Sequence, residues 1–131
     1  MASNKFVTEF EINASQRMLY PYLSSPSGLS AWFADDVTID EDKNYHIYWN
    51  GENHPAKIAA FRNNIFIKFE FIPGKGDNPE DETSLEFKLE KNELTNSTYL
   101  KIVDNTDTDD EEELEEIWEN MVNVLKETVG G

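Results

Sequence analysis

The sequence contains no cysteine and few basic residues, and each shortage excludes whole classes of protein. Without cysteine there are no disulfide frameworks, thiol nucleophiles or thiolate metal sites. The 131 residues include 11 Lys and Arg against 27 Asp and Glu, a formal net charge of -16. Nucleic-acid binding draws most of its affinity from Lys and Arg, so no nucleic-acid partner is expected. An anionic membrane surface is disfavoured for the same reason.

Long hydrophobic runs are also missing. No apolar run approaches the roughly 18 residues that a membrane span requires, so no span is expected. The first six residues carry no apolar stretch of the signal-peptide type, which predicts a cytoplasmic protein. The length and the 38% hydrophobic content predict a single globular domain over residues 1–131, because no linker or repeat divides the chain.

The motifs of common enzyme classes do not occur either. There is no Gly-x-Ser-x-Gly, no phosphate-cradling glycine loop and no dinucleotide fingerprint. His46 and His54, the two histidines, have no sequence neighbour that suggests a general base, and both are expected at the surface. Two histidines without cysteine also make a transition-metal site unexpected. The sequence therefore predicts a non-enzyme with no catalytic residue, metal or cofactor.

Most of the chain alternates polar and apolar residues with a period of two, which indicates strands with one buried face. Seven segments have this pattern: residues 5–12, 37–40, 45–49, 54–61, 65–71, 84–90 and 97–104. Asn50-Gly51 favours a two-residue hairpin turn, because both of its positions need a positive φ. Strands with one wet face predict an antiparallel sheet that is covered on one side only.

Two short helices are expected after the first strand. The first is capped by Asn13 or Ser15 and ends near residue 23, because Pro21 removes a backbone donor and limits it to one or two turns. The second carries the apolar residues Leu29, Trp32 and Phe33.

A long helix is expected at the C-terminal end, over about residues 109–128, with Thr108 and Glu111 spaced as a capping box. At about 30 Å it is long enough to cross the sheet. Its apolar stripe consists of Leu114, Ile117, Trp118, Met121, Val122, Leu125 and Val129.

Four stretches spread over the whole chain resemble a known family: Phe10–Tyr20, Ser25–Phe33, Tyr45–Gly51 and Ile117–Gly131. The most specific is the Pro-x-x-Leu-x-x-Trp-Phe pattern in the second stretch. The chain resembles the START-like (Bet v 1-like) superfamily, near the group similar to the activator of the heat-shock-protein-90 ATPase. Residues 40–44 stand where that group commonly has a Pro-Gly-Gly-like turn, so co-chaperone activity is not carried over.

The resemblance implies an α+β helix-grip fold. Its curved antiparallel sheet of six to seven strands would wrap around the long C-terminal helix, with two short helices after the first strand. An apolar cavity often lies between the sheet and the helix. The inward-facing set here is Trp32, Phe33, Tyr45, Ile47, Trp49, Phe69, Phe87, Trp118, Met121 and Leu125.

The free energy of an empty cavity limits what this space can be. A pocket of about 300 Å³ at about 24 cal/mol per Å³ would cost roughly 7 kcal/mol. That is most of the net stability of a domain, which is about 5–15 kcal/mol. The space is therefore wet, liganded or filled by bulky side chains.

The leading functional hypothesis is non-catalytic binding of a small apolar or amphipathic ligand in this space. The expected ligand-binding residues are Trp32, Tyr45, Ile47, Trp49, Phe69, Phe87, Trp118 and Met121. Its mouth is expected near Trp32, Trp118 and the loop over residues 73–82.

The alternative is a protein-interaction or co-chaperone-like module, and the outward-facing Phe66 and Tyr48 are the first places to look for its contact patch. The third hypothesis is a cyclase- or hydrolase-like enzyme. Tyr45 and Thr98 are the inward polar residues that could then be catalytic. The sequence leaves the ligand, the protein partner and the oligomeric state open.

Overall fold

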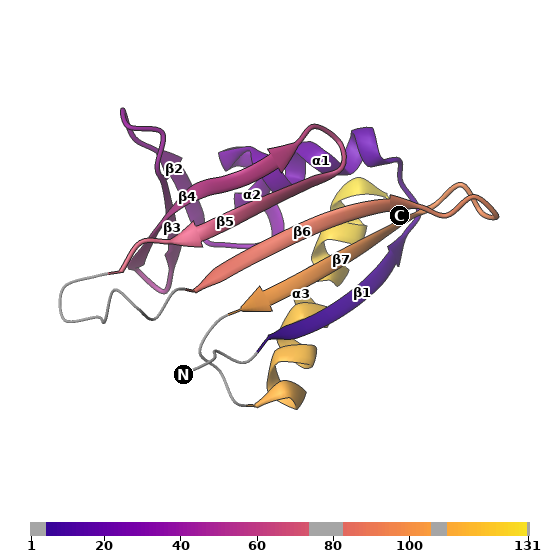
Figure 1. Ribbon diagram of the computed structural model, residues 1–131. Helices are drawn as coiled ribbons and strands as arrows, with labels where there is room; N and C mark the ends of the chain where they lie inside the picture. Colours follow the sequence, from indigo (N-terminus) through magenta and orange to yellow (C-terminus); the bar gives the residue numbers. More distant parts are fainter. Residues whose placement is uncertain (1–4, 74–82, 106–109, 131) are drawn as a thin grey trace.

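An open antiparallel sheet with helices across one of its faces makes up the protein (Figure 1). The structure is a computed structural model that describes residues 5–73, 83–105 and 110–130. The strands are β1 (Phe6–Ile12), β2 (Asp36–Ile39), β3 (Tyr45–Trp49), β4 (Glu52–Arg62), β5 (Phe66–Phe71), β6 (Ser84–Lys91) and β7 (Thr98–Asn105). The helices are α1 (Gln16–Ser24), α2 (Pro26–Trp32) and α3 (Glu111–Val129). The predicted α+β helix-grip architecture is confirmed, with seven strands.

The strand order follows the chain closely. Strands β2 to β7 form a meander and β1 completes the sheet beside β7, in the order β1-β7-β6-β5-β4-β3-β2. Every neighbouring pair is antiparallel. The hairpin between β3 and β4 turns at Asn50 and Gly51, whose φ values of 52° and 81° match the predicted turn. The register shifts between Ile58 and Ala60, and such a bulge bends a strand.

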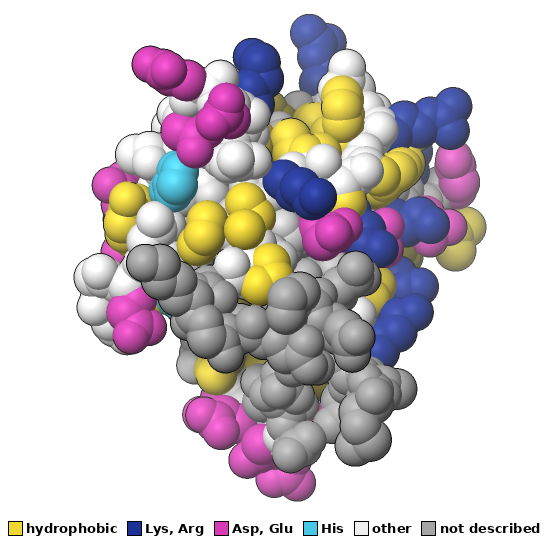
Figure 2. Space-filling model, turned by 60° about the vertical axis from the view of Figure 1, so that its left-hand side comes forward, with side chains coloured by type: hydrophobic (Ala, Val, Ile, Leu, Met, Phe, Trp, Pro, Cys, Tyr) yellow, Lys and Arg dark blue, Asp and Glu magenta, His cyan; other side chains and the backbone are white. Residues whose placement is uncertain are grey.

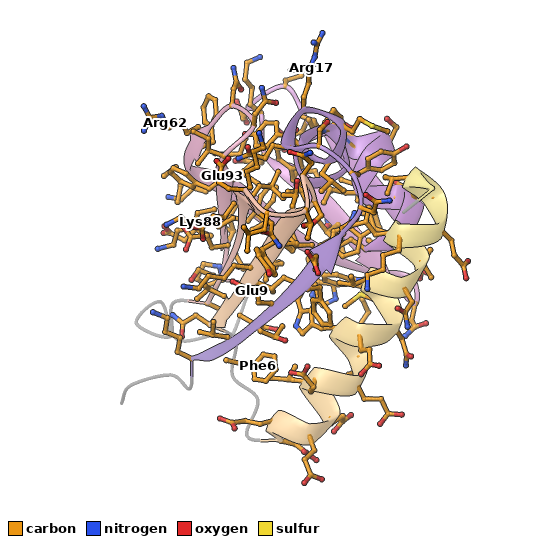
Figure 3. The ribbon with its side chains drawn as sticks, turned by 90° about the vertical axis from the view of Figure 1, so that its right-hand side faces the viewer. Phe6, Glu9, Arg17, Arg62, Lys88 and Glu93 are labelled. Atoms are coloured by element: carbon orange, nitrogen blue, oxygen red, sulfur yellow. The ribbon has the colours of Figure 1, made fainter. Side chains whose placement is uncertain are left out.

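The inner face of the sheet holds the core. Phe87 of β6 pairs with Ile67 of β5 and with Ile102 of β7, and all three side chains are buried. Seen edge-on in Figure 3, α3 crosses this inner face, while Lys88 and Arg62 point away from it. The alternation predicted from the sequence therefore places apolar residues against the helices and charged residues in water.

Helix α1 ends at Ser24, within one residue of the expected end near residue 23, and Pro21 lies inside it. Ser15 caps the helix, with its Oγ accepting a hydrogen bond from the backbone N–H of Met18 at 3.1 Å. The carbonyl of Pro21 accepts from the backbone N–H of Ser25 at 3.0 Å, which closes the last turn. The missing N–H of Pro21 thus removes one bond without ending the helix, which runs to Ser24.

Helix α2 packs closely against α1 at a glycine. A Cβ added to Gly28 would lie 2.1 Å from the carbonyl oxygen of Pro21 and 2.6 Å from the Cα of Tyr22. Ser25 begins the helix by accepting a hydrogen bond from the N–H of Gly28 at 3.0 Å. The contact between the two helices therefore requires a residue without a side chain at position 28.

Helix α3 begins slightly later than expected. Asp110 is its cap and accepts from the backbone N–H of Glu113 at 3.1 Å, while Thr108 lies outside the described residues. Gly130, with a φ of 79°, ends the helix. Its buried residues are Leu114, Trp118, Val122 and Leu125.

The predicted stripe of α3 was wrong at Ile117, which is 43% exposed. At about 100° per residue, Ile117 lies about 100° round the helix from the centre of the buried stripe. Val124 is 44% exposed on the same flank. The opposite flank faces β1, where Thr8 donates a hydrogen bond to Glu115 at 3.2 Å.

Candidate functional site

Five aromatic side chains meet between the sheet and α3, and we call them the aromatic cluster. They are Trp32 of α2, Phe33 directly after it, Trp49 of β3, Phe87 of β6 and Trp118 of α3. Phe33 stacks on Trp118 with ring centroids 5.8 Å apart and an interplanar angle of 12°. Phe33 also meets the edges of Trp49 at 4.9 Å and of Phe87 at 5.6 Å. These separations lie within the usual range of attractive aromatic pairs, so the rings fill this space by direct contact.

The indole N–H groups of the cluster are all hydrogen-bonded to the protein. Trp32 donates to the carbonyl of Tyr22 at 2.8 Å, Trp49 to the carbonyl of Phe33 at 2.7 Å, and Trp118 to Asp104 Oδ2 at 2.9 Å. Asp104 is buried, so the hydrogen bond from Trp118 holds the indole ring in a defined orientation in the core. Among the described residues, no buried side-chain nitrogen or oxygen lacks a partner. The three tryptophans are therefore held in defined orientations.

The structure places all eight predicted ligand residues on the inner side, but in two groups. Trp32, Phe87 and Trp118 touch one another in the aromatic cluster. Tyr45 and Phe69 form a separate edge-to-face pair at 5.1 Å.

The remaining three predicted residues differ in burial. Ile47 is fully buried, whereas Trp49 and Met121 are partly buried and pack against the core. Trp49 joins the cluster through Phe33. The cluster therefore reaches the surface at Trp49, while Met121 is the partly exposed core residue one turn along α3 from Trp118.

Phe33 lies at the centre of the aromatic cluster, although the sequence did not predict it as a ligand-binding residue. It was placed inward but not among the ligand residues, yet it packs against Trp32, Trp49, Phe87 and Trp118. Its sequence signal is weak, because periodicity alone does not turn two adjacent aromatic residues to one side. Phe33 does so because it is the C-cap of α2, where the helix ends.

The inward polar residues considered for catalysis are engaged in structural hydrogen bonds. Tyr45 donates its hydroxyl to the carbonyl of Ser24 at 2.5 Å, and Thr98 donates to the carbonyl of Ala14 at 2.6 Å. Burial raises the pKa of Tyr45 above its ordinary value, and the nearby Tyr20 adds to the shift. Tyr45 therefore stays protonated and acts as a donor rather than as a base.

The histidines lie partly exposed and bind neighbouring side chains. His46 Nε2 lies 2.8 Å from Asp40 Oδ2, and its Nδ1 lies 3.0 Å from the side-chain nitrogen of Asn53. The hydrogen bond from His46 is the largest cause that lowers the pKa of Asp40. Both ring nitrogens of His46 are thus engaged with neighbouring side chains. His54 lies against the Trp49 ring at 5.0 Å.

A surface pocket of about 310 Å³ lies away from the aromatic cluster. Its lining comes from residues 15–17 at the start of α1, from Asn64 between β4 and β5, and from Lys91, Asn96 and Thr98 around the β6–β7 turn. Its lining residues all have polar side chains, although they expose apolar as well as polar atoms, and it is not the cavity between sheet and helix that the resemblance implied. Sequence reasoning missed it because its residues come from three separate segments. The expected cavity mouth includes residues 74–82, which lie outside the described residues.

The described ranges contain neither a cluster of metal-ligating side chains nor a membrane-spanning helix. No group of three or more His, Asp and Glu side chains there is arranged to hold a metal ion. None of the helices described is long and apolar enough to cross a bilayer.

Comparison with known proteins assigns the family. The family model of the START-like superfamily domain matches residues 1–131. The comparison with curated proteins found no match.

Among solved structures, the chain is similar to the Aha1 dimer of Colwellia psychrerythraea, with a TM-score of 0.75 and 20% identity, covering 96% of each chain. It is also similar to BfR322 of Bacteroides fragilis, with a TM-score of 0.63 and 33% identity, covering 98% of this chain and 92% of that one. A third similar structure is protein BH1534 of Bacillus halodurans, with a TM-score of 0.72 and 20% identity. The match covers 98% of this chain and 99% of that one. With the family model matching from end to end, the chain belongs to the START-like superfamily.

Proposed function

We propose that this is a non-catalytic binding protein whose ligand is a small apolar or amphipathic molecule held between the sheet and α3. The observation that supports this most directly is the aromatic cluster. Its rings come from α2, β3, β6 and α3 and gather in one place instead of spreading through the core. Small-molecule sites are lined mainly by hydrophobic and aromatic side chains, with few polar groups. START-like folds commonly bind ligands of this kind.

The ligand would replace side chains rather than fill an empty space. The rings of the cluster are in contact, and an empty cavity of ligand size would cost much of the fold's stability. Trp49 of the cluster and Met121, one turn along α3 from Trp118, are the residues best placed to move, because both are partly exposed. Methionine adapts readily, since it is unbranched and has three rotatable bonds. In this proposal these two side chains close the site when no ligand is bound.

The other proposed ligand residues form the walls. Phe87 and Trp118 meet edge to face at 5.9 Å, and the hydrogen bond that Trp118 donates to Asp104 fixes the Trp118 ring. Ile47, Phe69 and Tyr45 continue the apolar wall along β3 and β5. An amphipathic molecule would therefore place its apolar part against this wall and keep its polar end near Met121, at the surface.

The three tryptophans give a direct test, because all of them belong to the cluster. Native mass spectrometry of protein from its source should detect a co-purifying molecule. Titration with oleate and a panel of fatty acids and sterols should shift the three indole ¹H–¹⁵N signals and raise the Tm. Absence of an adduct, of indole shifts and of any change in Tm would together overturn the proposal.

A matched pair of variants separates the site from the rest of α3. Met121→Trp should fill the edge of the cluster and weaken binding of the same probe. Val124→Trp changes an exposed residue three positions along the helix and should leave binding unchanged. Equal weakening by both variants would argue against this site.

A protein-interaction module remains the second candidate, supported by the exposed flank of α3 at Ile117 and Val124. On the face shown in Figure 2, hydrophobic side chains reach the surface in separate groups between charged ones. Crosslinking followed by mass spectrometry would test this function. A partner that crosslinks to the wild type but not to the Ile117→Asp, Val124→Asp variant would support it. A partner that crosslinks equally to both would rule out this flank.

A further inference from the structure

We infer that the polar surface pocket is a binding site for a phosphate-bearing ligand, separate from the aromatic cluster. Its volume of about 310 Å³ is at the lower end of the range for small-molecule sites. Its lining holds two cations, Arg17 and Lys91, and no Asp or Glu. In a chain with 27 acidic residues and a net charge of -16, this is a local reversal of the overall charge.

The cations and amides of the pocket are available to a ligand. Neither Arg17 nor Lys91 makes an ion pair within 4.0 Å with any part of the chain that the structure describes. The side-chain amides of Asn64 and Asn96 likewise make no hydrogen bond to a residue in that part. Four residues with side-chain N–H donors thus line one hollow, and these donors have no partner among the residues that the structure describes; the Arg17 side chain extends outward at its rim (Figure 3).

The pocket is held in shape by hydrogen bonds beneath it. Gln16 Nε2 donates to the carbonyls of Asn64 at 3.3 Å and of Leu89 at 3.2 Å, so the start of α1 is tied to the β4–β5 turn and to strand β6. Thr98, which is buried, is tied to the carbonyl of Ala14. Asn64 and Asn96 have positive φ values of 65° and 59°, a conformation that asparagine tolerates better than most residues. The donors therefore project from a defined frame.

The donor set suits a phosphate group better than an apolar or cationic ligand. A guanidinium presents its N–H groups as a fork that matches phosphate oxygens, and a lysine adds a point charge. Amide N–H groups can bond the remaining oxygens. The phosphate could belong to a soluble phosphate ester or to a phospholipid headgroup, since both present the same oxygens.

The acidic first turn of α3 lies away from this pocket, whereas Glu93 and the carboxylate of Glu11 lie at the β6–β7 turn beside it. In Figure 3, Arg17 and Arg62 lie at one end of the molecule and the start of α3, with its acidic first turn, lies at the other. Screening reduces the field of distant charges, because the Debye length is about 8 Å at physiological ionic strength. Salt should therefore weaken the overall repulsion of an anion along with the contacts in the pocket.

The test is an NMR titration of ¹⁵N-labelled protein with glycerol 3-phosphate and with inorganic phosphate, in which chemical-shift changes are followed. The ionic strength is kept constant with chloride. The expected result is a saturable set of shifts at residues 15–17, 64, 91 and 96, with no movement of the indole signals. The Arg17→Gln, Lys91→Gln variant should bind at least about tenfold more weakly. Lys101→Gln, an exposed cation on β7, is the matched control and should bind as the wild type does.

The source of the phosphate is tested with phosphatidylcholine vesicles that do or do not contain phosphatidic acid. Sedimentation with phosphatidic acid vesicles that is lost in the double variant would identify a headgroup as the ligand. Binding of glycerol 3-phosphate without vesicle binding would identify a soluble ester. Shifts that chloride reproduces, shifts outside the pocket, or binding that survives in the double variant would overturn the inference. Circular dichroism would confirm that the double variant is folded, as expected for two exposed side chains.

Discussion

Trp118 links α3 to the sheet through both its ring and its indole N–H. The ring stacks on Phe33 and lies edge to face with Phe87, while the N–H donates to the buried Asp104 of β7. Aromatic side chains bury large apolar areas, and a buried indole N–H normally finds an acceptor. One residue thus contributes packing and a hydrogen bond to the same helix–sheet contact.

The first prediction separates these two contributions. Trp118→Ala should lower the free energy of unfolding by about 3–5 kcal/mol, because it removes the whole ring. Trp118→Phe keeps an aromatic ring and should lose roughly 1–3 kcal/mol with the hydrogen bond to Asp104. Denaturant unfolding measures both values. Ile117→Ala, at the neighbouring exposed position, should change stability by about 0.5 kcal/mol or less. A near-neutral Trp118→Ala variant would contradict the assigned face of α3.

Glu11 ties β1 to the turn between β6 and β7. Its Oε2 accepts hydrogen bonds from Ser97 Oγ at 2.5 Å, Asn92 Nδ2 at 2.9 Å and Thr95 Oγ1 at 3.1 Å. These bonds, with Ser97 first, lower the pKa of Glu11 below its ordinary value of 4.5. The same turn contains Asn96, so Glu11 also supports one wall of the polar pocket.

The second prediction follows from the pKa of Glu11. A carboxyl whose pKa is lower in the folded state stabilises the fold above its unfolded pKa, near 4.5, and this contribution disappears as the pH falls through the folded pKa. Glu11→Gln should therefore be less stable than the wild type at pH 7, and the difference should shrink as the pH falls below about 4. Urea unfolding of both proteins over a pH series measures this. A difference that does not change with pH would show that the charge of Glu11 contributes nothing.

At the scale of elements, the contact between α1 and α2 depends on the absence of a side chain at Gly28. The carbonyl of Pro21 occupies the position where a Cβ would lie. A Cβ at position 28 would clash with this carbonyl, and the clash could be relieved only if the backbones of the two helices moved apart. Because Trp32 of α2 and Phe33 beyond it belong to the aromatic cluster, such a separation would also move the proposed ligand site.

The third prediction concerns this contact. Gly28→Ala should lower the free energy of unfolding by about 1–3 kcal/mol or more, even though alanine is the better helix former. Ser27→Ala, at the exposed neighbouring position of the same helix, should be close to neutral. Thermal unfolding compares the two variants, and a change in the indole signals of Gly28→Ala would report movement of the cluster. An equally stable Gly28→Ala variant would mean that the helices separate freely.

Elements with strong periodicity were predictable. The sheet followed from alternation, because a strand with one buried face must alternate. Helix α1 ended within one residue of its expected end although Pro21 lies inside it, because the packing of Leu19, Tyr20 and Leu23 outweighs one lost hydrogen bond. Ile117 was misplaced because an apolar residue at helical spacing can still fall on the flank of a stripe.

At the scale of the whole molecule, charge and apolar surface are arranged unevenly. The acidic first turn of α3 lies at one end, while Arg17 and Arg62 lie at the other (Figure 3). Figure 2 shows Lys and Arg side chains gathered at the top and right of another face. A net charge of -16 therefore coexists with positive regions, of which the pocket with Arg17 and Lys91 is one.

The sequence by itself determined the fold class, the seven strands, the helix across the sheet and the set of inward aromatic residues. These follow from local periodicity and turn chemistry, which act between residues close in the chain. Only the tertiary structure decided that Phe33 stacks on Trp118, that Pro21 touches Gly28, and that Arg17, Asn64 and Lys91 share one pocket. Such contacts depend on strand register and helix packing, which bring together residues far apart in the sequence.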